Sequence, residues 1–283
     1  MGLERLIPGR SRLISTMILL VTVSTSARPA ETEHLNVQLV SDTDSVQPGT
    51  ALSVGLHFEM EKNWHIYWKN PGDSGEPPRV RWNLPAGFQA GEVQWPAPAR
   101  LGSGSVIDYG YEQPVLLFVE MQTPENLTVG SRVTLSADVS WLVCKDICVP
   151  GKANVTLSLP VRTAPGSASA SQVLFRDARS RVPKPMPSKW RTDATSEKDG
   201  FVLTIHGADV ARASFFPLEA DQIDNAAPQT LTTLPGGLRV TLKKSEQLLK
   251  APALLDGVLE LSTGRSYTVS APVRTLPERS APR

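Results

Sequence analysis

Residues 133–161 read VTLSADVSWLVCKDICVPGKANVTLSLPV, and this stretch contains both cysteines of the chain. Apolar and polar side chains alternate in Val133–Val143, ahead of the cysteines, and again in Val155–Val161, behind them. Such alternation is typical of a half-buried β-strand. The pattern predicts two antiparallel strands joined by a turn at or near Cys144 and Cys148. Such a turn can bring the two Cβ atoms near the short separation that a disulfide demands.

Similar strand-like segments occur upstream at short intervals, separated by turns rich in Pro and Gly. They are Leu35–Val40, Ala51–Phe58, Trp64–Trp68, Val80–Leu84 and Val115–Glu120. Many short strands with frequent turn signals are typical of a β-sandwich. Residues 31–163 are therefore predicted to form a sandwich of immunoglobulin-like type.

Downstream, the composition shifts to Ala, Ser, Gly and Pro, which predicts a linker over residues 164–190 with one short helix near Gln172–Arg181. A second set of strands follows, without cysteine: Gly200–His206, Ala213–Phe216, Thr230–Thr233, Gly237–Leu242, Gly257–Leu261 and Tyr267–Ala271. The predicted fold class is all-β, with two tandem β-sandwich domains. The second, smaller domain spans residues 191–275, and residues 276–283 form a loose tail.

The N-terminus has the features of a secretory signal. Three arginines precede the short apolar run Leu13–Val23, and small residues follow it. A run of this length is too short for a spanning helix, which needs about 20 residues. We expect residues 1–30 to be a cleaved signal peptide and the mature protein to be a soluble monomer in the periplasm; the alternative is an uncleaved N-terminal anchor. The formal net charge of +1 in 283 residues gives no indication of nucleic-acid binding.

The cysteine pair admits three interpretations: a redox pair, a structural disulfide and a metal site. In the chain-entropy model, a disulfide that closes a five-residue loop stabilises the folded state by roughly 2 kcal/mol. A disulfide that closes a hundred-residue loop contributes nearly 5 kcal/mol. A disulfide that closes a small loop stabilises the fold little and is easily broken and remade, which favours the redox interpretation. Two thiolates do not complete a tetrahedral metal site, and none of the four histidines has ligand spacing to the pair. Cu(I) held by two thiolates and a methionine remains an alternative.

The residues between the cysteines would affect thiol reactivity in opposite directions. Lys145 should lower the pKa of a neighbouring thiol, and Asp146 should raise it. The alternative, which the sequence favours, is that both are solvated residues of a hairpin tip. The chain has no glycine-rich phosphate loop, so we expect no nucleotide or flavin cofactor, and no metal is needed for thiol exchange. No nucleophile–base constellation of a hydrolase is recognisable.

Several segments resemble one family. Ser140–Pro150 resembles the cysteine motif in the N-terminal periplasmic domain of the DsbD thiol–disulfide reductases, and is closer still to the ScsB-like branch. Asn63–Gly75, Trp95–Pro98 and Asp108–Tyr111 are similar to that branch as well. The resemblance covers roughly Leu35 to Val161, and the second half resembles the second β domain of ScsB-like proteins with lower specificity.

The resemblance implies an immunoglobulin-like domain that takes reducing equivalents from a transmembrane thiol reductase and passes them to periplasmic thioredoxin-like or other disulfide-carrying proteins. It implies that Cys148 is the nucleophile and Cys144 the resolving thiol. A cap loop would shield the pair, and the positions facing it here would be His65, Tyr67 and the segment Pro96–Ser105. The alternative for His65 and Tyr67 is an ordinary half-buried strand face. Trp141, Lys145 and Asp146 would also line the site.

This sequence departs from the family pattern in two ways. Three residues separate its cysteines, where the enterobacterial DsbD domain has five, and the predicted cap segment is rich in Pro, Gly and Ser instead of acidic and aromatic residues. Family members also continue into a membrane domain, so we expect either a free-standing carrier with a separate membrane partner or a product of a split or degraded gene. Two other functions remain open, a binding or assembly module with a passive disulfide and a copper-handling protein.

Overall fold

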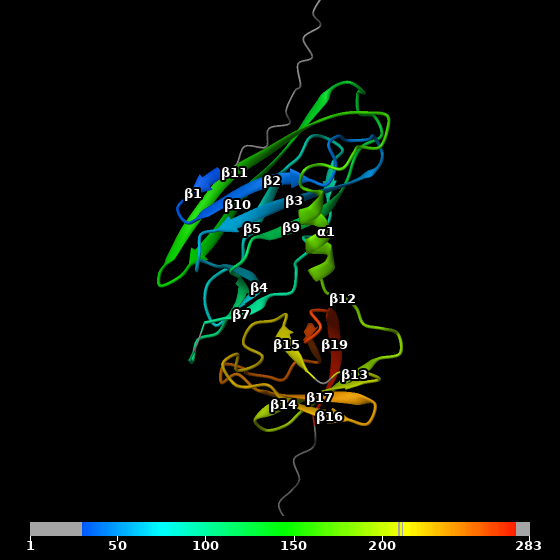
Figure 1. Cartoon of the computed structure of the whole chain (residues 1–283). Helices are drawn as coiled ribbons and strands as arrows, with labels where there is room; N and C mark the ends of the chain where they lie inside the picture. The colour runs from blue at the N-terminus through cyan, green and yellow to red at the C-terminus, as the bar shows by residue number, and fades with distance from the viewer. Residues whose placement is uncertain (1–29, 103, 209, 211, 276–283) are drawn as a thin grey trace, which may run out of the picture.

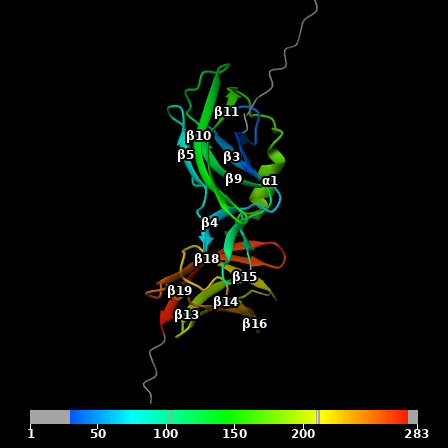
Figure 2. The same cartoon turned by 90° about the vertical axis from the view of Figure 1, so that its left-hand side faces the viewer.

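The structure is a computed structural model that describes residues 30–275 except for residues 103, 209 and 211 (Figure 1). Nearly all regular elements are strands, as predicted. Figures 1 and 2 show two bodies stacked end to end, which we call the N-terminal body (residues 30–182) and the C-terminal body (residues 184–275). The predicted signal peptide, apart from Ala30, and the predicted tail lie outside the described residues.

Two sheets form most of the N-terminal body. The five-stranded sheet contains, in spatial order, β1 (Ala30–Thr32), β2 (Leu35–Ser41), β3 (Ala51–Met60), β9 (Val115–Gln122) and β6 (Gln89–Ala90). The three-stranded sheet contains β11 (Cys148–Pro160), β10 (Arg132–Cys144) and β5 (Arg79–Asn83). Apolar side chains of both sheets meet in one hydrophobic core, as in the immunoglobulin-like sandwich that the sequence predicts.

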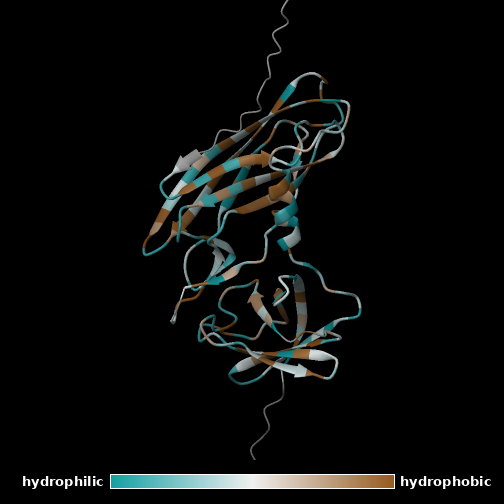
Figure 3. Cartoon of the chain, in the orientation of Figure 1, coloured by the Kyte–Doolittle hydropathy of each residue, from teal (hydrophilic) through white to brown (hydrophobic). Residues whose placement is uncertain are grey.

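Alternation along the strands explains which side chains enter this core. In β10, Leu135, Ala137, Val139 and Trp141 are buried, and the residues between them are half-buried or exposed. Figure 3 shows the same alternation as brown and teal bands along the strands of the N-terminal body. The pairing register joins β10 to β11 along their whole length, with Cys144 opposite Cys148. The predicted antiparallel hairpin is therefore confirmed.

A third, smaller sheet lies in the N-terminal body, at the end that faces the C-terminal body (Figure 1). It contains β4 (Ile66–Gly72), β8 (Asp108–Tyr111) and β7 (Ala99–Leu101), with β8 in the middle. Sequence analysis placed the first of these strands at Trp64–Trp68, and the observed strand begins two residues later. The ring of Phe216 and the side chain of Val258, both from the C-terminal body, join the core cluster of the N-terminal body at this sheet.

The C-terminal body is built on an eight-stranded sheet. Its order is β15 (Ala213–Pro217), β18 (Leu254–Leu261), β19 (Ser266–Thr275), β13 (Arg191–Ser196), β14 (Gly200–His206), β17 (Gly237–Lys243) and β16 (Thr230–Leu234), with β12 (Lys184–Pro185) paired to β19. It has a hydrophobic core of its own, centred on residues such as Phe201, Leu203 and Leu259. No strand pair in the described part of the chain joins the two bodies.

The predicted linker is structured. The helix α1 (Gln172–Arg181) has the predicted bounds, and its Phe175 and Ala178 are buried against Val40, Leu116 and Phe118 of the five-stranded sheet. The boundaries between the predicted domains, at 163/164 and 190/191, stay predictions. None of the helices in the described residues has the length and apolar character needed to cross a bilayer.

Candidate functional site

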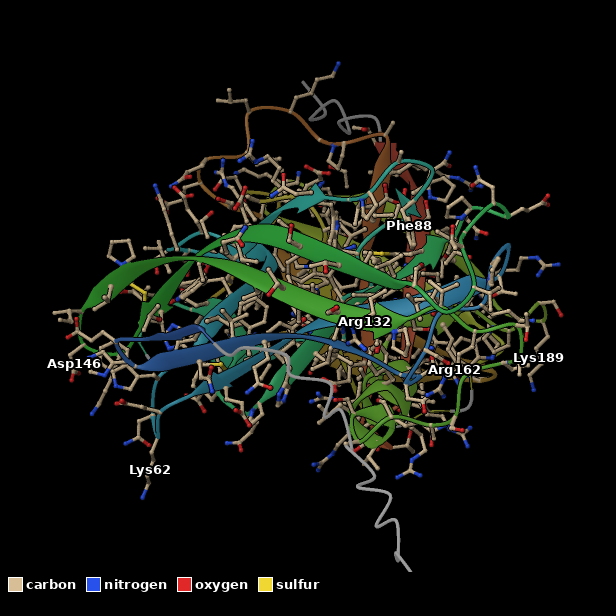
Figure 4. All side chains as sticks on the ribbon, turned by 90° about the horizontal axis from the view of Figure 1, so that it is seen from above. Lys62, Phe88, Arg132, Asp146, Arg162 and Lys189 are labelled. Carbon is tan, nitrogen blue, oxygen red and sulfur yellow. A yellow bond between two sulfur atoms is a disulfide. The ribbon has the colours of Figure 1, made fainter. Side chains whose placement is uncertain are left out.

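Cys144 and Cys148 form a disulfide at the tip of the β10–β11 hairpin, with their Cα atoms 4.1 Å apart. Figure 4 shows it as a yellow bond close to Asp146. The N–H and C=O groups of Cys144 both bond to the backbone of His65, at 2.9 Å each, on the side of β10 away from β11. Cys144 and Cys148 are therefore a non-hydrogen-bonded pair of the ladder, the kind in which opposite side chains come closest.

The proline that follows the pair fits the same register. Pro150 lies opposite Leu142, two residues along the hairpin from the cysteines. Because hydrogen-bonded and non-hydrogen-bonded pairs alternate, this position requires no ladder bond from residue 150. Proline, which has no N–H to donate, therefore removes no hydrogen bond between β10 and β11, and the hairpin stays regular up to the disulfide.

The two cysteines differ sharply in exposure. Cys144 is only 2% exposed, and its backbone pairs with that of His65, whereas Cys148 is exposed to solvent. Ile147, next to Cys148, is 66% exposed, and Lys145 and Asp146 are exposed as well. Of the two cysteines, Cys148 is therefore the one that a molecule approaching the hairpin tip can reach.

Tyr67 lies beside the exposed cysteine. Its hydroxyl oxygen is 3.6 Å from Sγ of Cys148, and because that sulfur carries no proton in the disulfide, the hydroxyl is the donor. Burial raises the pKa of the Tyr67 hydroxyl above its usual value, so the group stays protonated at neutral pH. It can therefore donate a hydrogen bond to the sulfur of Cys148.

His65 lies two residues before Tyr67, and its side chain is an imidazole instead of a phenol. Its ring meets that of Tyr67 edge to face, with the ring centroids 5.2 Å apart. Burial lowers the pKa of His65, an effect that the nearby carboxylates of Asp108 and Glu112 oppose. Its Nε2 atom is buried without a hydrogen-bond partner in the described part of the structure, and the closest carboxylate oxygen, Oδ2 of Asp108, is 4.0 Å away.

The other three predicted site residues lie near the cysteines in the chain, at the hairpin tip and in the core. Lys145 and Asp146 occupy the exposed tip of the hairpin. Trp141 points toward the core, where its ring packs edge to face on Phe58 and lies across Gly151. Cys144, Cys148, His65 and Tyr67 are thus the predicted residues that the fold brings together.

Two residues of the segment predicted as the cap make contacts away from the cysteines. The backbone N–H of Ala97 donates a hydrogen bond to the backbone oxygen of Arg181, and the guanidinium of Arg100 donates one to the backbone oxygen of Asn225. Gly75 packs directly on Tyr67, since an added Cβ there would lie 2.0 Å from the tyrosine ring. We call residues Asp73–Gly75 the cover loop.

Sequence analysis missed the residues that hold the cover loop. The N–H and the hydroxyl of Ser74 both donate to the carboxylate of Asp108, at 3.0 and 2.9 Å. Gly75 has a φ of +73°, which a residue with a side chain rarely adopts. The run of turn-forming residues before Gly75 was a usable signal, because a glycine required in the left-handed region marks a loop with a fixed conformation.

Among the described residues, no three His, Cys, Asp or Glu side chains gather closely enough to hold an ion. The arrangement consists of one buried and one exposed sulfur, a phenol donor and a buried imidazole.

Comparisons with known proteins agree with this description. Residues 35–160 match the family model described as "Thiol:disulfide interchange protein DsbD, N-terminal". A solved structure, the N-terminal periplasmic domain of ScsB from Proteus mirabilis, superposes with a TM-score of 0.65 at 16% sequence identity, over 88% of this chain and 99% of that one. At this identity the superposition shows a shared fold. No curated protein sequence matches the chain.

Proposed function

We propose, from the premise that residues 35–160 form a domain of the DsbD N-terminal type, that this chain exchanges disulfides with partner proteins through Cys148 and Cys144. The observation that carries the proposal is the unequal exposure of the two sulfurs, together with the Tyr67 hydroxyl beside the exposed one. An exposed sulfur next to a fixed donor suits attack on a partner, and a buried sulfur suits the second, intramolecular step.

The exchange conserves atoms and electrons. In the reduced protein, the thiolate of Cys148 attacks one sulfur of a partner disulfide, the partner's S–S bond breaks, and its other sulfur leaves as a thiolate. The thiolate of Cys144 then attacks Sγ of Cys148 in the mixed disulfide. The partner leaves with two thiols after taking up protons from solvent, and the Cys144–Cys148 bond has formed at the cost of two electrons passed to the partner.

The Tyr67 hydroxyl is the group that would stabilise the attacking thiolate. Hydrogen bonds to a charged acceptor are stronger than bonds to a neutral one. Because the tyrosine stays protonated, its donation strengthens when Cys148 ionises, which favours the thiolate. Exposed Ile147 offers a partner an apolar contact directly beside the reacting sulfur.

The cellular setting forms part of this proposal. The predicted signal peptide and the periplasmic origin of the structural match support a periplasmic location, where disulfides form and persist. We propose that a transmembrane thiol reductase returns the pair to the dithiol form and that thioredoxin-like or other disulfide-carrying proteins accept the electrons.

The reduction potential of the pair tests the proposal. Equilibration in glutathione or dithiothreitol buffers, followed by trapping of free thiols, should give a value of roughly −270 to −120 mV, the range of catalytic pairs. A value below about −300 mV, typical of structural disulfides, would instead support the passive disulfide of a binding module.

Two matched variants assign the roles of the cysteines. Cys144→Ser should accumulate a mixed disulfide with a thioredoxin-like partner, because it lacks the thiol that resolves the intermediate. Cys148→Ser should accumulate little, because the remaining sulfur is buried. Equal trapping by both variants, measured on non-reducing gels, would reject the assignment of Cys148 as nucleophile.

A further inference from the structure

The cover loop depends on the C-terminal body for one of its anchors. Asp73 uses both carboxylate oxygens: Oδ2 accepts the N–H of Ile107 at 2.7 Å, and Oδ1 accepts Nδ2 of Asn225 at 2.7 Å. The first bond is internal to the N-terminal body, whereas Asn225 belongs to the loop that precedes β16. The C-terminal body therefore holds the first residue of the loop that packs on Tyr67.

Asn225 is built into the junction between the bodies. It is only 6% exposed, and besides its bond to Asp73 its Oδ1 atom accepts the hydroxyl of Tyr109 at 2.8 Å. Its backbone oxygen accepts Arg100 at 2.5 Å. Both Tyr109 and Arg100 belong to the small sheet of β4, β8 and β7. The side-chain amide is thus fixed in the orientation that presents Nδ2 to Asp73.

A continuous set of contacts leads from this amide to the disulfide. Asn225 holds Asp73, and two residues later Gly75 packs on the ring of Tyr67. The hydroxyl of that ring lies 3.6 Å from Sγ of Cys148. The bond to a carboxylate is the charge-assisted kind, which fixes geometry more firmly than a neutral hydrogen bond.

We propose that Asn225 is a positioning residue for thiol exchange: it holds the cover loop on Tyr67 and thereby keeps the tyrosine hydroxyl against Cys148. The C-terminal body accordingly takes part in setting the reactivity of the cysteine pair. This inference rests on the proposed function for its biological meaning, but its physical content, a dependence of Cys148 reactivity on Asn225, can be measured without any partner.

The test compares isosteric variants of the full mature chain. Asn225→Asp keeps the shape of the side chain and its acceptor for Tyr109 but sets a second carboxylate against Asp73. In the reduced protein, we expect alkylation of Cys148 by iodoacetamide at neutral pH to slow by about fivefold, the scale of one typical net hydrogen bond. The pH midpoint of the alkylation profile should rise accordingly.

Exchanging the two residues provides the rescue. In the double variant Asp73→Asn with Asn225→Asp, one amide and one carboxylate again face each other, and the amide oxygen at position 73 can still accept the N–H of Ile107. The alkylation rate should return to within about twofold of the wild-type rate. A loss that persists in this variant would contradict the proposed pairing.

A control on the same body separates positioning from general destabilisation. Among the residues that the structure describes, the amide of Gln229 bonds to the backbone of Phe215 alone, within the C-terminal body. Gln229→Glu therefore makes the same chemical change away from the cover loop. We expect this variant to keep the wild-type alkylation profile. If it slows alkylation as much as Asn225→Asp does, the effect is general and the inference fails.

The last comparison asks whether Asn225 acts through Tyr67. Residues that act through one shared contact are non-additive in a double-mutant cycle. Asn225→Asp should therefore change little in a Tyr67→Phe background, whereas a long-range effect of the added charge would persist there and would overturn the inference. Because alkylation needs no partner, absence of exchange in the wild type would reject the proposed function and leave this test unaffected.

Discussion

At the scale of single residues, Tyr67 is the side chain whose chemistry bears most directly on Cys148. Tyr67→Phe removes the only polar atom of the ring and leaves its packing against Gly75 intact. We expect alkylation of Cys148 in the reduced protein to slow by about three- to tenfold at neutral pH, because one hydrogen bond to the thiolate is lost. Tyr267→Phe, in the C-terminal body, is the matched control. An unchanged rate in Tyr67→Phe would mean that the hydroxyl does not support the thiolate.

A second prediction at this scale concerns acid stability. Burial lowers the pKa of both His57 and His65 in the folded protein. The unfolded chain therefore binds more protons on acidification, and stability that is complete above the ordinary histidine pKa of about 6.5 is lost as the pH falls toward the folded-state values. We expect the melting temperature to fall between pH 7 and pH 5, and less steeply in His57→Gln and His65→Gln. Equal slopes in all three proteins would reject burial of these imidazoles as the cause.

Residue-level reasoning from the sequence found four members of the site but not its supports. The sequence shows two cysteines in a short loop between strands of alternating polarity. It also shows an aromatic strand that carries a histidine and a tyrosine on one face. The bond from Ser74 to Asp108 is not visible, because it joins segments that are 34 residues apart in the chain. The packing of Gly75 on Tyr67 is not visible either, because it depends on how the chain turns back after β4. Only the three-dimensional pairing of β4 with β8 brings those segments together.

At the scale of elements, the β10–β11 hairpin should need little help from its disulfide. Thirteen cross-strand residue pairs hold the two strands in register. Replacing both cysteines with alanine should therefore lower the free energy of unfolding by about 2 kcal/mol, as expected for a five-residue loop. Urea denaturation of the double variant against the oxidised wild type measures this. Failure of the double variant to fold would favour the structural interpretation of the disulfide.

Element prediction succeeded where the periodicity was strong. Helix α1 and strand β14 have the predicted bounds, since each has a clear apolar face. Strand β13 was missed because its sequence, RTDATS, is almost entirely polar and its place is set by pairing with β14 and β19. Strand β8 was missed because DYGY has the composition of a turn, although all four of its residues are buried.

At the scale of the whole molecule, the two bodies should unfold together because they share buried aromatic contacts. Phe216 of the C-terminal body packs on Tyr109 and Trp68, with ring centroids 5.2 and 6.5 Å apart. Phe216→Ala should cost about 3 kcal/mol or more and separate one calorimetric transition into two. Phe215→Ala is the control, because that ring lies in the core of the C-terminal body. Identical thermograms for the two variants would contradict a role of Phe216 in joining the bodies.

Strand β4 also contacts the C-terminal body directly. Asn70 donates to the backbone oxygens of Pro217 and Glu219, at 2.8 and 3.2 Å, and is itself buried. It lies on β4, three residues after Tyr67. Sequence analysis could not predict that the same strand would contact the disulfide at one end and the C-terminal body at the other, because that depends on which segment covers each edge of the small sheet.

The register of the hairpin also determines how far the backbone must move when the disulfide is reduced and re-formed. Cys144 and Cys148 face each other across a ladder position where the backbones are already close, 4.1 Å between Cα atoms. The backbone of Cys144 is also held from its far side by His65. Breaking and remaking the sulfur–sulfur bond therefore requires rotation of two side chains and little rearrangement of the strands. We therefore expect each cycle of reduction and oxidation to move the backbone very little. Crystal structures of the reduced and oxidised proteins should superpose almost without difference in their backbones.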